Sequence, residues 1–324
     1  MPISSPSDEL QVWLLEEENP SARYWTLRAL MGYPEEDELV RRARARIVEA
    51  SPAHDILRAQ WPEGYWVAPG IGYSPKYRAT IWQILFLAQL GAPPIEPILC
   101  ACEYVLSHAR LPDGRFSAGE GSRGALLCLN GNLLRALCWF DFREDPRVQA
   151  AADALAAQIT HQGLRCRFNG RTPGGGIPAS MTEGLPCAWG AVKAGLGLLS
   201  VGVEHPERAA AVSQIQRLLI EHDLCEAAYP TATEPSLLWW RFGFPLGYTS
   251  DALEALTLLR WMGHEDDMRL RPAVERAWAK RDAKGRWHLE YTPEKTWGSF
   301  GSLGAPNKWV TIRALLALPP NGAA

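Results

Sequence analysis

The sequence predicts an all-α fold of the α/α toroid type, in which a ring of inner helices is wrapped by a ring of outer helices. Segments that are apolar on every side alternate with amphipathic segments, and a helix that is apolar all round must be buried. The apolar segments recur at intervals of 50 to 64 residues, which leaves room for two helices and a loop in each unit. Pairing one buried helix with one half-exposed helix buries both sets with short connections.

The 324-residue chain is assigned to a single toroid domain at 21–318, preceded by an N-terminal segment, 1–20, and followed by a C-terminal tail, 319–324. An open helical solenoid built from the same units is the competing architecture. Closure into a ring is favoured because the last predicted helix has no outer partner after it and can pack against the first helix.

The inner helices are predicted from their lack of charge. Residues 79–90 contain no charged side chain, and Gly91 with two prolines ends the segment. Small residues such as Gly195 and Gly197 would let neighbouring inner helices approach closely. In chain order, the inner helices are expected at 21–31, 78–90, 128–140, 187–199, 251–261 and 308–318.

An amphipathic outer helix follows each inner helix except the last. Residues 35–49 are rich in Arg, with Val40, Ala43 and Ile47 on one face, as expected for a half-solvated helix. A break containing Gly or Pro separates the two helices of most units. The outer helices are expected at 35–49, 95–108, 148–160, 206–221 and 270–281.

The composition argues against a dedicated nucleic-acid surface. Apolar residues make up 47% of the chain, charged residues 21%, and the net charge is -3, whereas phosphate binding needs a basic face. No apolar run reaches bilayer length, and the N-terminus lacks the basic and apolar regions of a signal peptide. We therefore expect a cytoplasmic protein that acts on a small molecule. The odd number of seven cysteines favours thiols over a disulfide framework.

The turn Gln60-x-x-x-Gly64-x-Trp66 resembles the Gln-Trp motif of the squalene cyclase and protein prenyltransferase superfamily, whose members are α/α toroids. Turns at 111–116, 162–166 and 283–287 are similar to degenerate copies of it. The starts of four inner helices look most like a bacterial branch of prenyltransferase/squalene-oxidase repeat proteins. The likeness covers most of the chain from about residue 21 onward. It implies the toroid fold and, as an expectation, an enzyme that acts on a prenyl or terpenoid substrate.

The catalytic motifs of the better-known branches are not matched. Squalene-type cyclases protonate their substrate with an Asp-x-Asp-Asp motif, and the nearest string here is His264-Glu-Asp-Asp267. It lies between an inner and an outer helix, where a solvated helix-start cluster is expected. The Asp-x-Cys pair with which protein prenyltransferases hold zinc is not met at Cys187, because Leu185 stands two positions before it.

Three cysteines nevertheless predict a zinc site. Cys128 and Cys187 each begin a buried helix in consecutive units, and Cys166 ends the turn between them. The loops before the inner helices of a toroid gather at one end of the ring, so these thiols can converge. Three protein ligands with an open fourth position are the pattern of a catalytic zinc site. The alternative is that each cysteine is a small core residue.

Asp251 begins the next inner helix at the matching position. It is a candidate fourth ligand or general acid, or alternatively a helix N-cap, because Asp251-Ala-Leu-Glu254 has capping-box spacing. Aromatic residues on the inner helices, or in the loops before them, are candidates for the wall of an apolar pocket, and each can equally fill space between splayed helices. They are Trp82, Trp189, Trp239, Trp240, Tyr248 and Trp309.

Three functions stay open at this point. The first is an enzyme with a central aromatic-lined pocket and zinc as candidate cofactor, acting on a prenyl, terpenoid or other largely apolar substrate by cyclase, transferase or hydrolase chemistry. The second is a carbohydrate-active toroid, a lyase or hydrolase, which needs two facing carboxylates. Asp251, Glu120 and Glu183 lie in suitable loops for that role. The third is a non-catalytic toroid that binds a ligand or partner in the same cavity.

Overall fold

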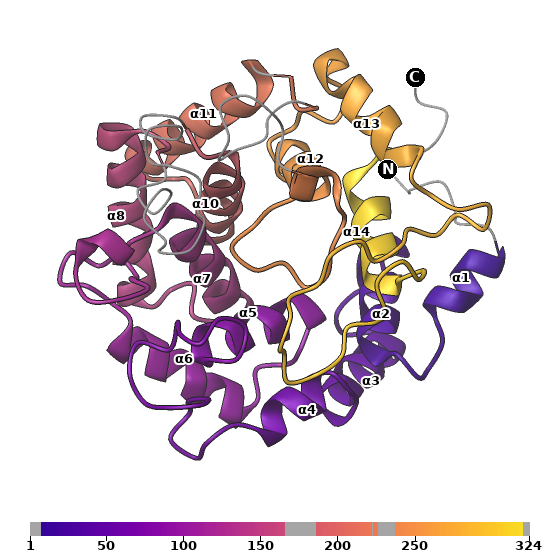
Figure 1. Ribbon diagram of the computed structural model, residues 1–324, viewed down its shortest axis with the longest axis horizontal. Helices are drawn as coiled ribbons and strands as arrows, with labels where there is room; N and C mark the ends of the chain where they lie inside the picture. The colour runs from indigo at the N-terminus through magenta and orange to yellow at the C-terminus, as the bar shows by residue number, and fades with distance from the viewer. Residues whose placement is uncertain (1–7, 166–185, 222, 226–236, 320–324) are drawn as a thin grey trace.

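The computed structural model describes residues 8–165, 186–221, 223–225 and 237–319. Within these ranges the chain is helical and contains no β-strand, only isolated bridges such as the one between Arg110 and Phe116. The helices are arranged as two concentric rings when the molecule is seen down its shortest axis (Figure 1). The predicted α/α toroid is therefore confirmed.

Within the described part of the chain, six helical segments form the inner ring. They are α2 (Pro20–Trp25) with its π-helical continuation η1 (Thr26–Leu30), α5 (Thr80–Leu90), α7 (Leu127–Trp139), α10 (Ala188–Val201), α12 (Ala252–Trp261) and α14 (Lys308–Ala317). Neighbours contact each other around the ring, with α14 packed against α12 on one side and against α2 and η1 on the other. Ser21 Oγ donates to Leu90 O at 2.6 Å and joins α2 to α5. The first and last helices thus close the ring as predicted, and the open solenoid is excluded.

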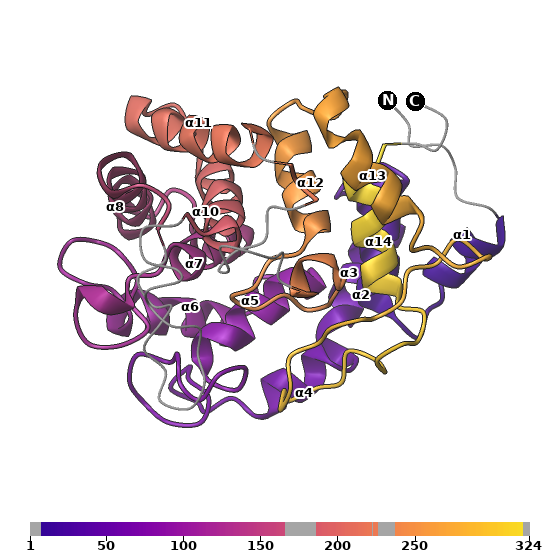
Figure 2. The ribbon, with the colours of Figure 1, turned by 45° about the horizontal axis from the view of Figure 1, so that its top comes forward.

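The outer ring surrounds these segments (Figure 2). Its helices are α3 (Glu38–Arg46), α4 (Ala53–Arg58), α6 (Glu96–His108), α8 (Pro146–Gln162), α11 (Pro206–Glu221) and α13 (Arg271–Trp278). The short helical turn η2 (Ile47–Glu49) directly follows α3, and a second one, η5 (Met268–Leu270), directly precedes α13. Every predicted helix is present with its ends shifted by a few residues, and α4 is an additional one.

Glycines allow the close approach of α7 and α10. A Cβ atom on Gly131 would lie 2.1 Å from the carbonyl oxygen of Lys193, and a Cβ atom on Gly197 would lie 2.5 Å from the carbonyl oxygen of Gly131. Only glycine fits at such distances, because real Cβ atoms do not come so close to backbone. On the other side of α10, a Cβ atom on Gly195 would meet Leu258 of α12 at 2.7 Å. The small residues of α10 therefore bring it close to both neighbours.

The Gln-Trp-like turn and two of its expected copies share one hydrogen-bond pattern. Each contains a glycine with left-handed backbone, Gly64 (φ 91°), Gly114 (φ 94°) and Gly285 (φ 76°). Two residues later, an aromatic residue donates its backbone N–H to a side chain of the next inner helix. These bonds are Trp66 to Thr80 Oγ1 (3.1 Å), Phe116 to Asn130 Oδ1 (2.7 Å) and Trp287 to Thr311 Oγ1 (3.0 Å). The motif thus fixes each inner helix to the turn before it. The copy at 162–166 ends at Cys166, outside the described residues.

A further helix, α1 (Asp8–Leu14), was not predicted and packs on the outside of the toroid. Leu10 and Leu14 are buried, and Glu9 pairs with Lys284 at 2.9 Å. The described part of the N-terminal segment is therefore attached to the turn before α14.

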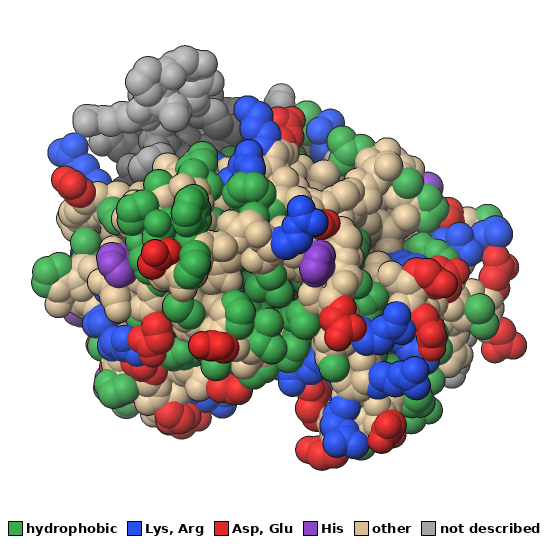
Figure 3. All heavy atoms as spheres, turned by 90° about the horizontal axis from the view of Figure 1, so that it is seen from below, with side chains coloured by type: hydrophobic (Ala, Val, Ile, Leu, Met, Phe, Trp, Pro, Cys, Tyr) green, Lys and Arg blue, Asp and Glu red, His purple; other side chains and the backbone are tan. Residues whose placement is uncertain are grey.

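The surface carries charges of both signs. On the face that Figure 3 shows, Lys and Arg side chains are mixed with Asp and Glu side chains. None of the described helices combines the length and the apolar character that crossing a bilayer requires.

Candidate functional site

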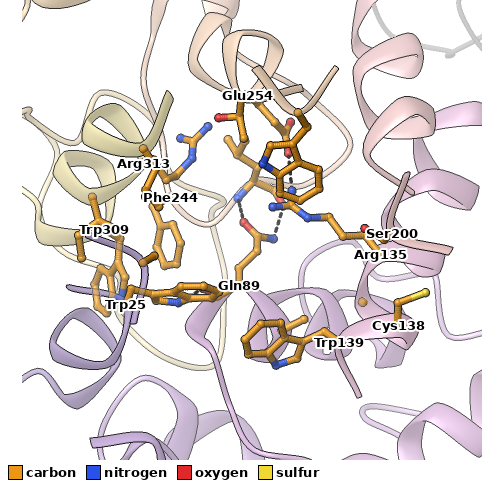
Figure 4. Close-up of a pocket in the computed structure, with 18 of the residues that line it drawn as sticks. Trp25, Gln89, Arg135, Cys138, Trp139, Ser200, Phe244, Glu254, Trp309 and Arg313 are labelled. Carbon is orange, nitrogen blue, oxygen red and sulfur yellow. Dashed lines mark hydrogen bonds and ion pairs between the residues drawn. The ribbon is translucent and has the colours of Figure 1, made fainter. Parts of the chain in front are cut away.

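A cavity of about 930 Å³ lies inside the inner ring. Its wall is formed by the C-terminal halves of α5, α7 and α10, by η1, by one face each of α12 and α14, and by Phe244 and Leu246 from the loop before α12 (Figure 4). Small-molecule sites have volumes of about 300–1,000 Å³. The cavity is therefore the candidate site.

Aromatic side chains form much of this wall. The rings of Trp25 and Trp139 lie 5.1 Å apart, and those of Phe244 and Trp309 stack at 5.0 Å and 8°. The indole N–H groups of Trp25, Trp139 and Trp309 donate to Gln89 O (3.1 Å), Ala92 O (2.9 Å) and Ser21 Oγ (2.8 Å), respectively. Because these polar groups are occupied, the indoles present apolar ring surface to the cavity.

Gln89 fixes the loop that carries Phe244 and Leu246. Its Oε1 accepts a hydrogen bond from Leu246 N at 2.8 Å, and its Nε2 donates to Leu246 O at 2.9 Å (Figure 4). Asn132 of α7 donates to Gly247 O at 2.9 Å. The loop is therefore held against two inner helices and forms a defined part of the wall.

Glu254 of α12 is the one carboxyl group among the described residues that line the cavity. Lys193 Nζ lies 2.7 Å from its Oε2, and Ser250 Oγ donates to the same oxygen at 2.8 Å. Burial acts to raise the pKa of Glu254, but attraction to Lys193 and two neighbouring arginines outweighs it, so the pKa lies below its ordinary value. The side chain is therefore ionised at neutral pH and is not poised as a general acid.

Asp251 is buried, and its carboxylate is fully engaged. It is the N-cap of α12, because Oδ1 accepts from Glu254 N at 2.9 Å. Arg313 donates to both carboxylate oxygens, at 2.6 Å and 2.9 Å. The N-cap alternative is thus present, and Asp251 does not line the described cavity. The pair with Arg313 occupies the oxygens that a general acid would present to a substrate.

Arg135 of α7 extends into the cavity toward Glu254 (Figure 4). About 39% of its side-chain surface is accessible, and this surface contributes to the cavity wall. Arg135 Nη1 lies 3.4 Å from Glu254 Oε1, and the guanidinium carbon lies 5.5 Å from the ring of Trp261. Burial lowers the pKa of Arg135, but a guanidinium stays protonated in proteins.

The predicted zinc ligands lie away from this cavity. Cys128 and Cys187 line one much smaller pocket near the N-terminal ends of α7 and α10. Cys187 is the N-cap of α10, with Sγ accepting the N–H of Gly190 at 3.3 Å. Cys166 lies outside the described residues, and among those described no three His, Cys, Asp or Glu side chains come together as a metal site. Zinc binding therefore stays a prediction.

Of the six aromatic residues predicted to line a pocket, Trp309 lines the described cavity. The indole N–H groups of Trp82, Trp239 and Trp240 donate to Tyr73 O, Leu224 O and Cys225 O. Trp189 and Tyr248 pack edge to face at 6.4 Å. These five lie near the starts of inner helices or in the preceding loops, whereas the cavity is bordered largely by later helix turns, and they do not line it.

Four charged residues of the site are not among those predicted from the sequence. Arg135, Lys193, Glu254 and Arg313 each interrupt an otherwise largely apolar inner helix. A charge in such a helix must be paired or face a polar space, because leaving it buried and alone is costly. That interruption is the signal by which they could have been found.

The string at 264–267 is a helix start. Asp267 is the N-cap of η5 and accepts from Arg269 N at 3.0 Å. Hydrogen bonds from Arg269 hold the pKa of Asp267 at about 2. The string is therefore the solvated cluster expected from its position, and it does not line the described cavity.

Fold and site together define an α/α toroid that encloses a ligand-sized cavity with aromatic and charged walls. No protein-family model matches the chain, and no curated protein sequence matches it. Among solved structures, it is similar to an Asp-to-Ala variant of the type II terpene cyclase MstE from Scytonema in complex with its product, merosterolic acid A. The identity is 12%, the alignment covers 93% of this chain and 79% of that chain, and the TM-score is 0.44. For MstE without ligand, the identity is 13%, the coverage 82% and 94%, and the TM-score 0.30.

Proposed function

We propose that the protein is an enzyme that binds a largely apolar small molecule, of the prenyl or terpenoid class, in the cavity inside the inner ring. The observation that carries the proposal is the cavity itself, with its volume of about 930 Å³ and its aromatic wall. Such a wall favours an apolar body, since burying apolar surface is the main source of affinity in sites of this kind. The resemblance of the turn at 60–66 to the squalene cyclase and prenyltransferase motif points to the same substrate class.

The described wall does not favour proton-initiated cyclisation. Such a reaction needs a neutral carboxylic acid that faces the substrate, whereas Glu254 is ionised and held by Lys193. The positive charge of Arg135 would also oppose a carbocation nearby. The proposal is therefore binding and turnover of an apolar molecule by chemistry that does not use these carboxyl groups as acids.

The carbohydrate alternative has weaker support. It needs a pair of carboxyl groups that face each other across the substrate. Glu254 is the one carboxyl group on the described wall, Glu120 is exposed on a loop, and Glu183 lies outside the described residues. A matched pair is therefore not present in the described part of the site.

Ligand-induced thermal stabilisation tests the proposal, because a molecule that binds only the folded state raises the melting temperature. Farnesol and geranylgeraniol are expected to raise the Tm of the wild type, and soluble oligosaccharides are not. Ala29→Trp, at a half-buried position on the cavity wall, is expected to remove the shift. Ala210→Trp, at an exposed position of α11, is the matched control and should keep it.

Absence of a shift with every isoprenoid would contradict the proposal, as would a full shift in Ala29→Trp. Product analysis by mass spectrometry addresses turnover. An isoprenoid that shifts the Tm but is recovered unchanged would favour a non-catalytic toroid instead.

We propose separately that zinc binds at the pocket lined by Cys128 and Cys187. Metal analysis of protein purified without chelator is expected to give about one zinc per chain, as for a single three-ligand site. Cys128→Ala and Cys187→Ala should lose it, and Cys102→Ala, on the outer helix α6, should retain it. A metal-free wild type would end this proposal.

A further inference from the structure

Arg135 brings a positive charge to the cavity wall that the neighbouring side chains do not balance. Asp251 and Arg313 form one buried ion pair, with a contact of 2.6 Å, and Lys193 and Glu254 form a second, at 2.7 Å. Arg135 is the fifth member of this group, so three cations stand against two anions. Charges inside proteins are normally paired, because an unpaired one loses its hydration without replacement.

The guanidinium of Arg135 also has N–H donors available for a ligand. It has five N–H donors, and within the described part of the chain one hydrogen bond engages it, the contact of 3.4 Å to Glu254 Oε1. Its accessible surface forms part of the cavity wall. Figure 4 shows the side chain reaching into the space between Glu254 and Gln89. A ligand atom in the cavity can therefore approach it directly.

We infer that the natural ligand of the cavity is an apolar molecule with one singly charged anionic head group of the carboxylate kind, which Arg135 holds while the apolar body lies against the aromatic wall. This rests on the proposed function, that the cavity binds a largely apolar small molecule. The planar guanidinium fork matches a carboxylate in a two-bond contact.

The charge balance favours a single negative charge over a diphosphate. One anionic group neutralises the excess charge of the cluster, whereas further negative charge would lie close to the carboxylate of Glu254. Three further arginines of the described chain line the wall. Arg313 and Arg260 are engaged by protein groups, and Arg143 interacts with the thiol of Cys138. Arg313 donates to Asp251 and to Gly243 O at 2.6 Å, and Arg260 lies near the carbonyl oxygens that end α14, at 3.3 Å and 3.4 Å.

Two ligands with the same chain isolate the head group. Farnesoic acid and farnesol differ in the charge of one end, so the ratio of their Kd values, measured by titration calorimetry near pH 7, reports the contact to Arg135. The wild type is expected to bind farnesoate at least about tenfold more tightly, as for a charge-assisted hydrogen bond. Arg135→Met, which keeps an unbranched side chain without charge, is expected to bring the ratio to about one. Arg217→Met, on an exposed part of α11, should retain the wild-type ratio.

Equal binding of the two ligands by the wild type, or an unchanged preference in Arg135→Met, would overturn the anionic head group while leaving the proposed function intact. Failure of both ligands to bind would count against the proposed function and this inference together. Farnesyl diphosphate is the third probe. Tighter binding of the diphosphate than of farnesoate would overturn the single charge.

Discussion

At the scale of single residues, Glu254 controls the electrostatics of the cavity wall. Its carboxylate accepts from Lys193 and Ser250 and lies 3.4 Å from Arg135. Lys193 is buried, and burial lowers the pKa of its amine while attraction to Glu254 acts against that change. Without Glu254, the buried ammonium group of Lys193 would lose the carboxylate that pairs with it.

Glu254→Gln is therefore expected to lower the free energy of unfolding by about 3–5 kcal/mol, the cost of breaking a buried ion pair on one side. Urea denaturation measures this. The control is Glu275→Gln, which removes an exposed pair with Arg271 and should cost less than about 0.5 kcal/mol. The double variant Glu254→Met with Lys193→Met should recover much of the loss. An unchanged urea midpoint in Glu254→Gln would contradict the role of the pair.

Because Glu254 is ionised in the folded protein, we expect the protein to lose stability in acid. Glu254 has a pKa below its ordinary value of 4.5 in the folded protein, so the unfolded chain binds more protons over that interval. Its contribution is fully present above the unfolded value and is lost as the pH falls through the lower, folded value. Urea midpoints measured from about pH 7 to about pH 3 should fall less steeply in Glu254→Gln than in the wild type. Parallel curves for the two proteins would refute this origin of acid sensitivity.

At the scale of helices, the contact of α7 with α10 depends on backbone meeting backbone. Gly131→Ala places a methyl group 2.1 Å from the carbonyl oxygen of Lys193. Alanine gains about 1 kcal/mol of helix propensity over glycine. We expect the clash to win, because carbonyl groups within a packed helix cannot move aside, with a net loss of about 1–3 kcal/mol. Gly119→Ala, where an added Cβ atom meets nothing within 4 Å, is the control. Thermal denaturation showing Gly131→Ala as stable as the control would refute the close contact.

The inner helices could be predicted because the apolar pattern that marks them in the sequence is also what buries them in the fold. α5 is apolar on all sides and ends at Gly91, whose φ of 81° is the left-handed conformation of a helix C-cap. α1 was not predicted because it is short and buries only Leu10 and Leu14. The positions of the inner helices thus follow from apolar pattern and chain breaks, both of which are local.

The residues of the site were harder to predict from the sequence than the helices were. The site is formed by faces of different helices, and these faces meet only when the ring is closed. Polar residues at helix starts, such as Cys187 and Asp251, stand out in the sequence, but here they cap α10 and α12. The cavity lies farther along the helices, where Arg135 and Glu254 approach from units that are 119 residues apart. No local pattern encodes that meeting.

At the scale of the whole molecule, the toroid is closed by contacts between its two ends. Trp309 Nε1 donates to Ser21 Oγ at 2.8 Å across 288 residues, and Lys308 pairs with Glu16 at 2.6 Å across 292 residues. Trp309 and Trp25 both line the cavity. The cavity is therefore complete only when α14 docks against α2 and η1, so closure and ligand binding depend on the same contact.

Trp309→Phe tests that dependence, since it removes the hydrogen bond to Ser21 while keeping an aromatic ring. Losing a neutral hydrogen bond costs about 1 kcal/mol. Part of that cost should lower the free energy needed to separate α14 from α2 locally. Native-state hydrogen exchange is expected to speed up in α14 and also in α2, which lies at the other end of the chain, because both helices lose protection when the closure opens. Amides of α7 and α10, on the far side of the ring, should exchange at wild-type rates under the same conditions. Faster exchange in α14 alone would mean that the two ends open independently, and the ring would then not be a cooperative closure.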